Sequence, residues 1–365
     1  SAKIKTQINK LSQNRIDITF KINEGDKTKI KGIKFIGNKI LTHIQNYLLG
    51  TDLSEFHSGY RAFSVSALNK IHFNLNTDDF HFDAEIIIQL LIAKVFIKEI
   101  PIPTYYGDEI SYVNGFVYAY NVLKTTLSAK FQSLGIFYRR KYDLKFSISH
   151  TNDYKPKLDF PSPLTYSIKR INKKGAKVID AGSSKGYMSV FLQKKGFRVT
   201  SIDLCEPESV FNLHNYIQHD LNKELWPIDL DQYDYILLLD VIEHLVSPEN
   251  FIDVLKYQIR KTQSIRIHAS TGNVGFIITR FMLLFGQFNY GKRGILDLTH
   301  TRLFTFRTFK RLFEQAGFDV EEVCGVPAPF PLAFGKNWVS SMMLWMNQLM
   351  IKLSKSLFSY QIFLV

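Results

Sequence analysis

The stretch from Lys177 to Leu192 has the residue types of a turn that binds a ligand. Apolar residues typical of a buried strand run up to Asp180, and an apolar helical pattern resumes after Gly186. Gly182 and Gly186 allow the backbone between the two elements to turn tightly. A strand, turn and helix of this kind direct the unpaired amides of the helix N-terminus at a ligand.

Three further acids follow apolar runs that read as strands. Asp203 ends the run from Phe197, at the spacing of about twenty residues where an acid of a nucleotide-binding fold accepts hydrogen bonds from ribose hydroxyls. Asp220 follows a shorter run and is placed to hold an adenine amino group, and Asp240 ends the run from Tyr235. In a doubly wound sheet, these acids would line one crevice at the carboxyl ends of the strands.

This ordered set resembles the class I S-adenosylmethionine-dependent methyltransferases. The resemblance implies a Rossmann-like α/β fold with a doubly wound sheet and S-adenosyl-L-methionine as the cofactor. Family members usually have Gly-Cys-Gly where this chain has Gly182-Ser183-Ser184. An ordinary sheet whose acids cap helices is the alternative. The implied cofactor-binding residues are Asp180, Gly182, Ser183, Ser184, Gly186, Asp203, Leu204, Asp220, Leu221 and Asp240.

Methyl transfer mainly requires orientation of the two reactants and removal of water, and a base is needed when the acceptor is a hydroxyl. The candidate catalytic residues are His244, Glu243 and His300. His244 lies beside the expected crevice and has a side chain type suited to proton removal, although a helix-capping role is an alternative. Asp240, Glu243 and His244 also admit a metal site, as in some quinone-ring O-methyltransferases. The expected cofactor is nevertheless S-adenosyl-L-methionine alone, without a metal ion.

The segment from Gly286 to Phe306 is dense in polar and aromatic residues and is expected to select the acceptor. Asn289, Lys292 and Arg293 are the candidate substrate-binding residues, and the two cations would hold a phosphate of a lipid-linked or nucleotide-linked sugar. After it, Thr305 is expected to cap a helix through Ala316. A strand is expected over 318–323.

An upstream region carries a second resemblance. The stretches Lys34–Leu41, Leu53–Phe63, Phe80–Ile86 and Glu99–Ser111 resemble the C-terminal half of a family-two, inverting glycosyltransferase. The residues that match acidic or acceptor-facing positions are Glu55, His57, Arg61, Asp83 and Glu85. The upstream acids that would hold a cation and a sugar diphosphate are absent, so sugar transfer by this chain is expected to be lost.

Residues 1–32 differ in pattern from the rest of the chain. A helix is expected to end over 8–11, and strands are expected over 15–22 and 29–38. The two strands resemble part of a POTRA repeat of outer-membrane barrel-assembly proteins. Since the chain starts at Ser1, it is expected to be a fragment, and its first segment to be foreign.

The formal net charge of +13 favours an anionic partner. Aromatic and basic residues over 112–145 indicate either an amphipathic helix on an anionic membrane or a connector helix with a solvated face. The apolar window 274–288 is expected to be a core or interfacial helix rather than a membrane span.

Two cysteines without metal-type spacing favour a cytoplasmic location, where the protein could also contact the inner membrane peripherally. Nucleic acid is not expected as a partner, because no base-flipping signature occurs.

The whole chain therefore resembles bacterial bifunctional proteins that join a family-two glycosyltransferase to a class I methyltransferase. The expected divisions are 1–32, 33–142, a linker over 143–163, and a methyltransferase domain over 164–365. The expected function is O-methylation of a glycan or lipid-linked sugar, with a glycan, glycolipid or nucleotide-sugar as acceptor. A main role as a glycosyltransferase, and a POTRA-type interaction segment, are the alternatives.

Overall fold

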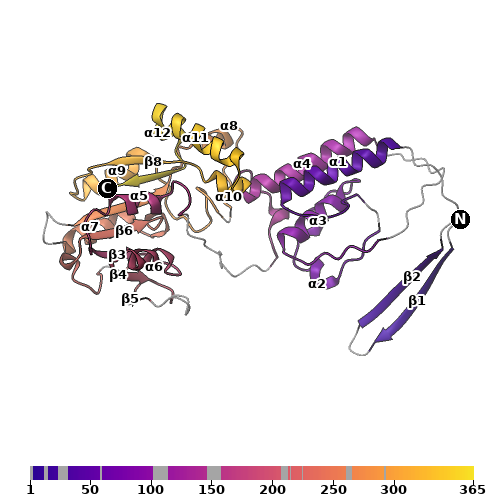
Figure 1. The fold of residues 1–365 in the computed structure, drawn as a ribbon, viewed down its shortest axis with the longest axis horizontal. Coiled ribbons are helices and arrows are strands. Elements are labelled where there is room, and N and C mark those ends of the chain that lie inside the picture. The colour runs from indigo at the N-terminus through magenta and orange to yellow at the C-terminus, as the bar shows by residue number, and fades with distance from the viewer. Residues whose placement is uncertain are drawn as a thin grey trace. The chain divides into compact units, whose positions relative to one another are not determined.

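A computed structural model describes residues 3–11, 15–23, 32–57, 60–101, 114–145, 158–206, 213, 215–223, 225–259, 265–291 and 293–365 (Figure 1). Side chains are described from Gly37 onward. The chain divides into two compact units. The first contains residues 1–131 and 139–148, and the second contains residues 132–138 and 149–365.

A seven-stranded sheet forms the centre of the second unit, with strand order β5-β4-β3-β6-β7-β9-β8. The first five strands in this order are parallel, and β9 runs antiparallel to both of its neighbours. The strands are β3 (Lys177–Ala181), β4 (Arg198–Asp203), β5 (Asn215–Gln218), β6 (Tyr235–Leu239), β7 (Arg266–Gly272), β8 (Val323–Val326) and β9 (Gln361–Leu364). The chain reverses its order beside β3, so the carboxyl ends of β3, β4 and β6 form the switch point where such sheets bind ligands.

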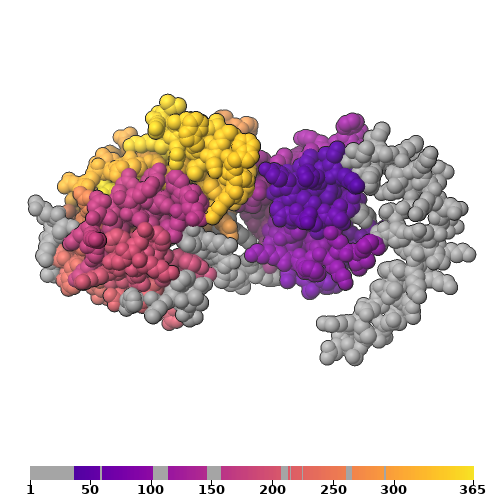
Figure 2. Space-filling model, viewed as in Figure 1, coloured from indigo at the N-terminus to yellow at the C-terminus, as the bar shows by residue number. Residues whose placement is uncertain are grey.

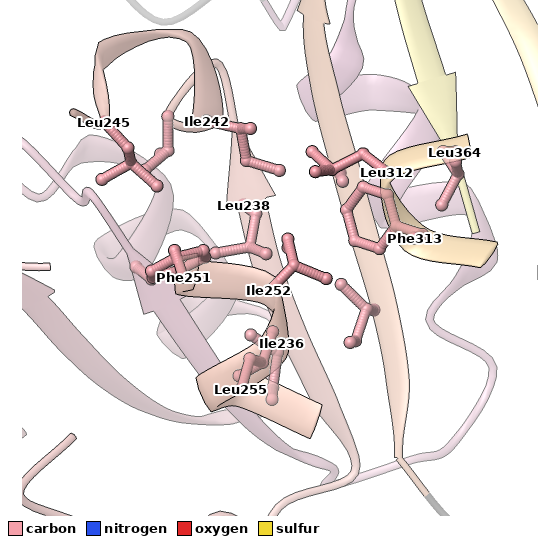
Figure 3. Close-up of a cluster of buried hydrophobic side chains, with 14 of the residues drawn as sticks. Ile236, Leu238, Ile242, Leu245, Phe251, Ile252, Leu255, Leu312, Phe313 and Leu364 are labelled. Atoms are coloured by element: carbon pink, nitrogen blue, oxygen red, sulfur yellow. The ribbon is translucent and has the colours of Figure 1, made fainter. Parts of the chain in front are cut away.

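Helices cover both faces of this sheet because its strands are apolar on both sides. Val178 and Leu237 face α5 (Pro163–Arg170) and α6 (Tyr187–Lys194) in one core cluster. The next residues along each strand, Ile179 and Leu238, belong to the larger cluster with α7 (Pro248–Gln258) and α9 (Phe306–Gln315). Figure 3 shows this larger cluster, in which side chains of α7 and α9 meet those of β6. The two layers fix the position of the loops at the sheet's carboxyl edge.

Shorter elements complete the second unit. Two 3-10 turns, η3 (Leu230–Gln232) and η4 (Ile242–His244), lie on either side of β6. The remaining helices are α8 (Ile277–Leu284), α10 (Phe330–Phe334), α11 (Trp338–Leu353) and the four-residue α12 (Lys355–Phe358). The chain between β8 and β9 is therefore mainly helical.

The first unit is mainly helical in its described part. Its helices are α1 (Gly32–Leu49), α2 (Val65–Leu68), α3 (Phe82–Ile92) and α4 (Gly115–Ser133), with 3-10 turns η1 (Phe73–Leu75) and η2 (Arg140–Tyr142). A hairpin of β1 (Lys3–Leu11) and β2 (Arg15–Asn23) precedes them. No helix among the described residues combines the length and the apolar character that a bilayer crossing needs.

Several local predictions were wrong. The strand expected over 29–38 is replaced from Gly32 by helix α1, because apolar residues recur at helical spacing through Leu48. The segment expected to end a helix, 8–11, belongs to strand β1, whose partner β2 supplies its hydrogen bonds. The helix from Gly32 removes the second strand of the pair on which the POTRA resemblance depended, although β2 itself was predicted correctly over 15–22.

Two further corrections concern the second unit. The strand expected over 318–323 begins only at Val323, because its partner β9 pairs with Val323–Val326. The sequence also predicts a strand over 265–268 that ends in a polar turn, whereas β7 continues past His268 to Gly272. In contrast, the helix after Thr305 is confirmed, with a capping box between Thr305 and Thr308. Most of the expected linker, 146–157, lies outside the described residues.

Candidate active site

The turn between β3 and α6 has the backbone that its glycines predicted. Gly182 and Gly186 have φ values of +71° and +88°, and Ser184 also lies in the left-handed region at 49°. A Cβ on Gly182 would lie 2.5 Å from Cγ2 of Val241, so the β6 loop packs directly against the turn. The hydroxyl of Ser183 is buried and has no hydrogen-bond partner. A polar group is thus left available inside a tightly packed cradle.

Asp203 lies beside this turn at the end of β4. Its Oδ2 accepts a hydrogen bond from the backbone N–H of Ser184 at 2.7 Å, and its Oδ1 accepts one from Cys205 at 3.0 Å. The side chain is half-buried. Since a carboxylate can accept about four hydrogen bonds, the remaining lone pairs suit the hydroxyls of a ribose. The carboxylate therefore lies at the carboxyl edge of the sheet and also shapes the turn.

Asp180 has a different environment. It is buried, and its Oδ2 accepts a hydrogen bond from Ser189 Oγ at 2.5 Å. Ser201 in turn donates to Ser189 Oγ at 2.7 Å. Burial raises the pKa of Asp180 to about 6, and the Ser189 hydrogen bond opposes this rise. Asp180 joins β3 to α6 and β4, which supports the turn from behind.

The predicted adenine side of the cleft is formed after β4 and β5. Asp220 follows β5, and its Oδ1 accepts hydrogen bonds from the backbone and side chain of Asn222, which lower the pKa of its carboxyl. Leu221 is 8% exposed and belongs to the main core, whereas Leu204 is 59% exposed. Leu204 is therefore exposed and can contact a ligand, whereas Leu221 anchors the segment with Asp220 to the core.

Asp240 ends β6 in the left-handed region, with φ of 57°. Gln361 of β9 donates from Nε2 to both of its carboxylate oxygens, at 2.8 and 2.7 Å. Ser270 of β7 donates to its Oδ1 at 2.7 Å. The side chain is therefore fixed by two neighbouring strands, which offsets the cost of an unfavourable backbone conformation.

Glu243 is 2% exposed, and its Oε2 has no hydrogen-bond partner. Burial, with a smaller contribution from the charge of Asp240, raises the pKa of Glu243 to about 8. Burial therefore favours the protonated form of this carboxyl. A protonated carboxyl cannot accept the proton of an attacking hydroxyl, so the raised pKa favours the histidines among the three catalytic candidates.

His244 and His300 come together although they are far apart in the sequence. Their ring centroids are 4.8 Å apart with an edge-to-face angle of 74°. The backbone explains the contact: the N–H groups of Thr301 and Arg302 both donate to the carbonyl of Glu243, at 2.8 and 3.2 Å. These bonds hold the acceptor loop against η4.

Each ring also has a defined tautomer. His300 Nδ1 lies 2.9 Å from the carbonyl oxygen of Ile295, and His244 Nδ1 lies 3.2 Å from that of Thr299. A carbonyl only accepts, so each Nδ1 carries the hydrogen and each neutral ring keeps its lone pair on Nε2. Burial lowers the pKa of His300, and the Ile295 hydrogen bond opposes this change. His300 is therefore neutral and basic at Nε2 under physiological conditions.

The candidate acceptor residues lie on the surface. Asn289 and Arg293 are exposed, and Asn289 Nδ2 donates to Gln287 at 3.1 Å. Lys292 lies outside the described residues. The structure thus leaves Asn289 and Arg293 accessible to a ligand without bringing them into the histidine pair.

The five glycosyltransferase-like residues are close together in the first unit. Arg61 donates to the carbonyl oxygens of Asp83 and Phe56, at 2.8 and 2.5 Å, and its Nη1 lies 3.6 Å from the Asp83 carboxylate. Glu55 accepts from the N–H of His57 at 2.7 Å. Glu85 is 1% exposed and forms an ion pair with Lys141. These contacts explain the presence of the five residues, which form a polar core of this unit.

The metal interpretation of Asp240, Glu243 and His244 gains no support from the contacts. Both oxygens of Asp240 accept hydrogen bonds from Gln361, and Glu243 is buried. Across the part of the chain that the structure describes, no group of three or more His, Cys, Asp or Glu side chains is arranged to hold a metal ion.

Sequence reasoning missed Gln361 and Ser270, the two residues that fix Asp240. Gln361 is 121 positions from Asp240 in the sequence, and β9 was not predicted. A short apolar run near the C-terminus, Ile362–Leu364, was the signal that a strand existed there. No local pattern indicates that it inserts between β7 and β8.

Residues 159–323 match a family described as a methyltransferase domain. A ubiquinone biosynthesis O-methyltransferase of Xylella fastidiosa is 29% identical over 181 residues, which cover 46% of this chain and 70% of that protein. Its counterpart in Marinobacter nauticus is 31% identical over 115 residues, or 28% of this chain and 48% of that protein. A methyltransferase structure from Archaeoglobus fulgidus is similar at 17% identity and a TM-score of 0.37, covering 55% of this chain and 89% of that one.

The family match spans the parallel strands of the sheet and the turn between β3 and α6. The strand order, with an antiparallel strand between the last parallel strand and the edge, is that of a Rossmann-like methyltransferase sheet. The buried Ser183 hydroxyl and the crowded Gly182 turn provide a cradle that fits S-adenosyl-L-methionine. The protein is an enzyme that contains a class I S-adenosylmethionine-dependent methyltransferase domain.

Proposed function

We propose that this domain methylates a hydroxyl group of a glycan or lipid-linked sugar. The observation that carries the proposal is the pair of His244 and His300, whose Nδ1 atoms are both directed at backbone carbonyls. Two imidazoles with free Nε2 lone pairs suit the removal of a hydroxyl proton. The relatives named as O-methyltransferases agree with an oxygen acceptor.

The cofactor residues receive roles in the same proposal. When bound, S-adenosyl-L-methionine supplies the methyl group. Asp203 would accept hydrogen bonds from the ribose hydroxyls, Asp220 would accept one from the adenine amino group, and Leu204 would provide an apolar contact for the ring. The turn residues Gly182, Ser183, Ser184 and Gly186, together with Asp240, would hold the methionine end. Asp180 and Leu221 act as supports, because both are buried.

His300 is the stronger candidate for the base. It is partly buried beside His244, and burial lowers its pKa, so it stays unprotonated below the ordinary pH range of histidine. His244 is more exposed and lies at the rim, where it orients the acceptor or relays the proton to water. Excluding water from this cleft strengthens the hydrogen bond between the acceptor hydroxyl and the imidazole.

A sugar acceptor is favoured by the polar segment after α8 and by the glycosyltransferase-like region upstream. Asn289 and Arg293 are exposed, so with Lys292 they offer hydrogen-bond donors and cations to a sugar phosphate. Glu55, His57, Arg61, Asp83 and Glu85 would be the remnant of a sugar-transferring domain in the same polypeptide. A glycosyltransferase main role is the alternative, and a nucleotide-sugar hydrolysis assay tests it. The proposed compartment is the cytoplasmic side of the inner membrane.

A ring hydroxyl is the second acceptor class. The relatives' names refer to ubiquinone biosynthesis, and their similarity covers the domain that holds the histidine pair. A catechol-type compound therefore belongs in the same assay as the isoprenoid-phosphate sugars.

The test measures methyl transfer from labelled S-adenosyl-L-methionine to both acceptor classes. The variants are His300→Ala, His244→Ala and the double substitution, with His219→Ala as a control outside the pair. Loss of a general base should lower kcat by roughly 10²–10⁴-fold. Preference for a sugar hydroxyl and loss in His300→Ala would support the proposal. Transfer to an amine, or an unchanged rate in the double variant, would overturn it.

A further inference from the structure

Helix α11 presents an apolar stripe to the surface. Six of its exposed apolar residues recur at helical spacing on one face: Trp338, Met342, Trp345, Met346, Leu349 and Leu353. The exposed fractions of Trp338, Trp345 and Leu353 are 75%, 60% and 85%. The buried residues of the same helix are polar, Ser340 and Asn347. The usual arrangement of an amphipathic helix in a water-exposed protein is therefore reversed.

Hydrogen bonds hold α11 in this orientation. Asn347 accepts from the backbone N–H of Ala328 and donates to the carbonyl of Phe358, both at 2.9 Å. At the start of the helix, Asn337 and Ser340 form a capping box. The inner face is thus fixed by specific polar contacts, and rotation of the helix to bury its tryptophans would break them.

Helix α8 and the residues after it have a second stripe of the same kind. Ile277, Phe281, Leu284, Phe285 and Phe288 are exposed at the spacing of one helical face. The rings of Phe281 and Phe285 pack edge to face with centroids 4.7 Å apart. On the inner side, Thr279 and Met282 are buried.

The two stripes belong to one part of the second unit. Phe276 and Ile278 at the start of α8 pack in a small core cluster with Phe330 of α10, and α10 packs against α11. Figure 1 shows α8, α10 and α11 at the same end of the unit, and Figure 2 shows the yellow C-terminal helices at its surface. We call the exposed residues of these two stripes the apolar face.

The charges around the apolar face have one sign. Neither 273–296 nor 326–365 contains an aspartate or glutamate. The described charged residues in these two segments are Arg280, Arg293, Lys336, Lys352 and Lys355, all of them exposed. Lys336 pairs with Asp159 at 2.6 Å, but that pair is itself exposed.

We propose that the apolar face lies on the surface of an anionic lipid bilayer. Tryptophan and phenylalanine side chains insert at the boundary of head groups and acyl chains, while lysines beside them attract anionic head groups. A second copy of the chain fits less well. In a two-fold contact between identical faces, the lysines would approach one another, and neither 273–296 nor 326–365 has an acid to pair with them.

The proposal is independent of the acceptor. It also provides a route to the site, because α8 follows β7 at the carboxyl edge of the sheet and leads into the loop with Asn289 and His300. A protein resting on this face would hold that loop near the bilayer surface. The apolar face is distinct from the segment 112–145, whose sequence suggested membrane contact and which belongs largely to α4.

Co-sedimentation with vesicles tests the proposal on the full chain. The vesicles contain phosphatidylcholine alone or phosphatidylcholine with phosphatidylglycerol. Binding is expected only to the anionic vesicles and should weaken as salt is raised. The double variant Trp345→Ala and Phe281→Ala should bind roughly tenfold less or weaker still, because each ring removes a large inserted apolar area. Lys352→Glu should lower binding further at low salt.

Tyr257→Ala supplies the matched control, because Tyr257 is 81% exposed on α7, outside the apolar face. Tryptophan fluorescence gives a second readout: Trp226 is buried, so a blue shift on anionic vesicles reports Trp338 and Trp345.

The proposal is overturned if anionic vesicles are not bound, or if the double variant binds like the wild type. It is also overturned if ultracentrifugation shows a dimer that the double variant loses, since a second copy would then cover the face. Methyl transfer to a water-borne acceptor can persist in every one of these cases.

Discussion

At the scale of single residues, the site contains both partly exposed carboxylates and two carboxyls that are buried. Asp203 is half-buried and keeps lone pairs for a ligand, whereas Asp180 and Glu243 are buried and have raised pKa values. The difference follows from desolvation, which disfavours the charged form. In the sequence, all three are acids near the end of a strand, so their positions alone do not distinguish them.

We expect Asp203→Ala to lower the affinity for S-adenosyl-L-methionine by about 10–100-fold, because hydrogen bonds to a charged group contribute about 1.5–3 kcal/mol. Part of the loss would come from the Ser184 N–H, which loses its acceptor. Isothermal titration calorimetry measures the change. Asp229→Ala, which removes an acid from the exposed start of η3, should leave the affinity unchanged. Wild-type affinity in Asp203→Ala would remove the ribose role.

We expect Glu243→Gln to change the pH dependence of stability. The folded pKa of Glu243, about 8, lies above its ordinary value of 4.5, so the native state binds the proton more tightly than the unfolded state. This group's contribution is complete below pH 4.5 and is lost as pH rises toward 8. The glutamine variant should therefore be more stable than wild type by about 1–2 kcal/mol at the alkaline end.

Urea unfolding at acid and alkaline pH measures this difference. Glu249→Gln is the matched control, because Glu249 is exposed in its pair with Arg302. Activity gives a separate result: methyl transfer should survive in Glu243→Gln, since a protonated carboxyl is not the base. A variant that gains no stability at high pH would show that the native pKa of Glu243 is not raised above its ordinary value.

At the scale of elements, the turn between β3 and α6 depends on two separate properties of glycine. One is the positive φ of Gly182, and the other is the space that its missing Cβ leaves for Val241. The chain supplies a comparison, because Gly196 has φ of +87° and no atom lies within 4 Å of the position that its Cβ would take.

We expect Gly196→Ala to cost about 1–2 kcal/mol from the left-handed backbone alone. Gly182→Ala should cost a further 1–3 kcal/mol, roughly, because the Cβ and the Val241 side chain must move apart. It should also weaken cofactor binding, which Gly196→Ala should not. Thermal unfolding and calorimetry of the two variants measure both effects. Equal losses of stability in the two variants would mean that Val241 moves away from the added Cβ without a cost in free energy.

At the scale of the whole molecule, the chain consists of two units with separate cores. The first is held by the buried network around Arg61 and Glu85, and the second by the clusters on the two faces of the sheet. Proteins of this type need not unfold in one step.

We expect differential scanning calorimetry to show two transitions, of which S-adenosyl-L-methionine raises only one. A ligand at a hundred times its Kd stabilises the unit that binds it by about 2.7 kcal/mol. Arg61→Ala should lower the other transition, because it removes the hydrogen bonds that Arg61 donates to the carbonyls of Phe56 and Asp83. Lys98→Ala, at an exposed position of the same unit, should change neither transition. A single transition raised by the ligand would indicate that the units unfold together.

The sequence alone determined the local parts of the fold and site. The strand, turn and helix around Gly182, the acid at the end of β4, and the capping box at Thr305 depend on residues close together in the chain, so their patterns can be read directly. Where two local patterns competed, as over 29–38, the longer helical one prevailed.

Only the tertiary structure decided which distant residues meet. It inserted β9 between β7 and β8, which places Gln361 on Asp240, and it fastened the acceptor loop to η4, which places His300 beside His244. It also determined which carboxyls are buried and which apolar helix faces remain exposed. These outcomes depend on contacts between segments far apart in the sequence, and such contacts leave no periodic pattern in either segment.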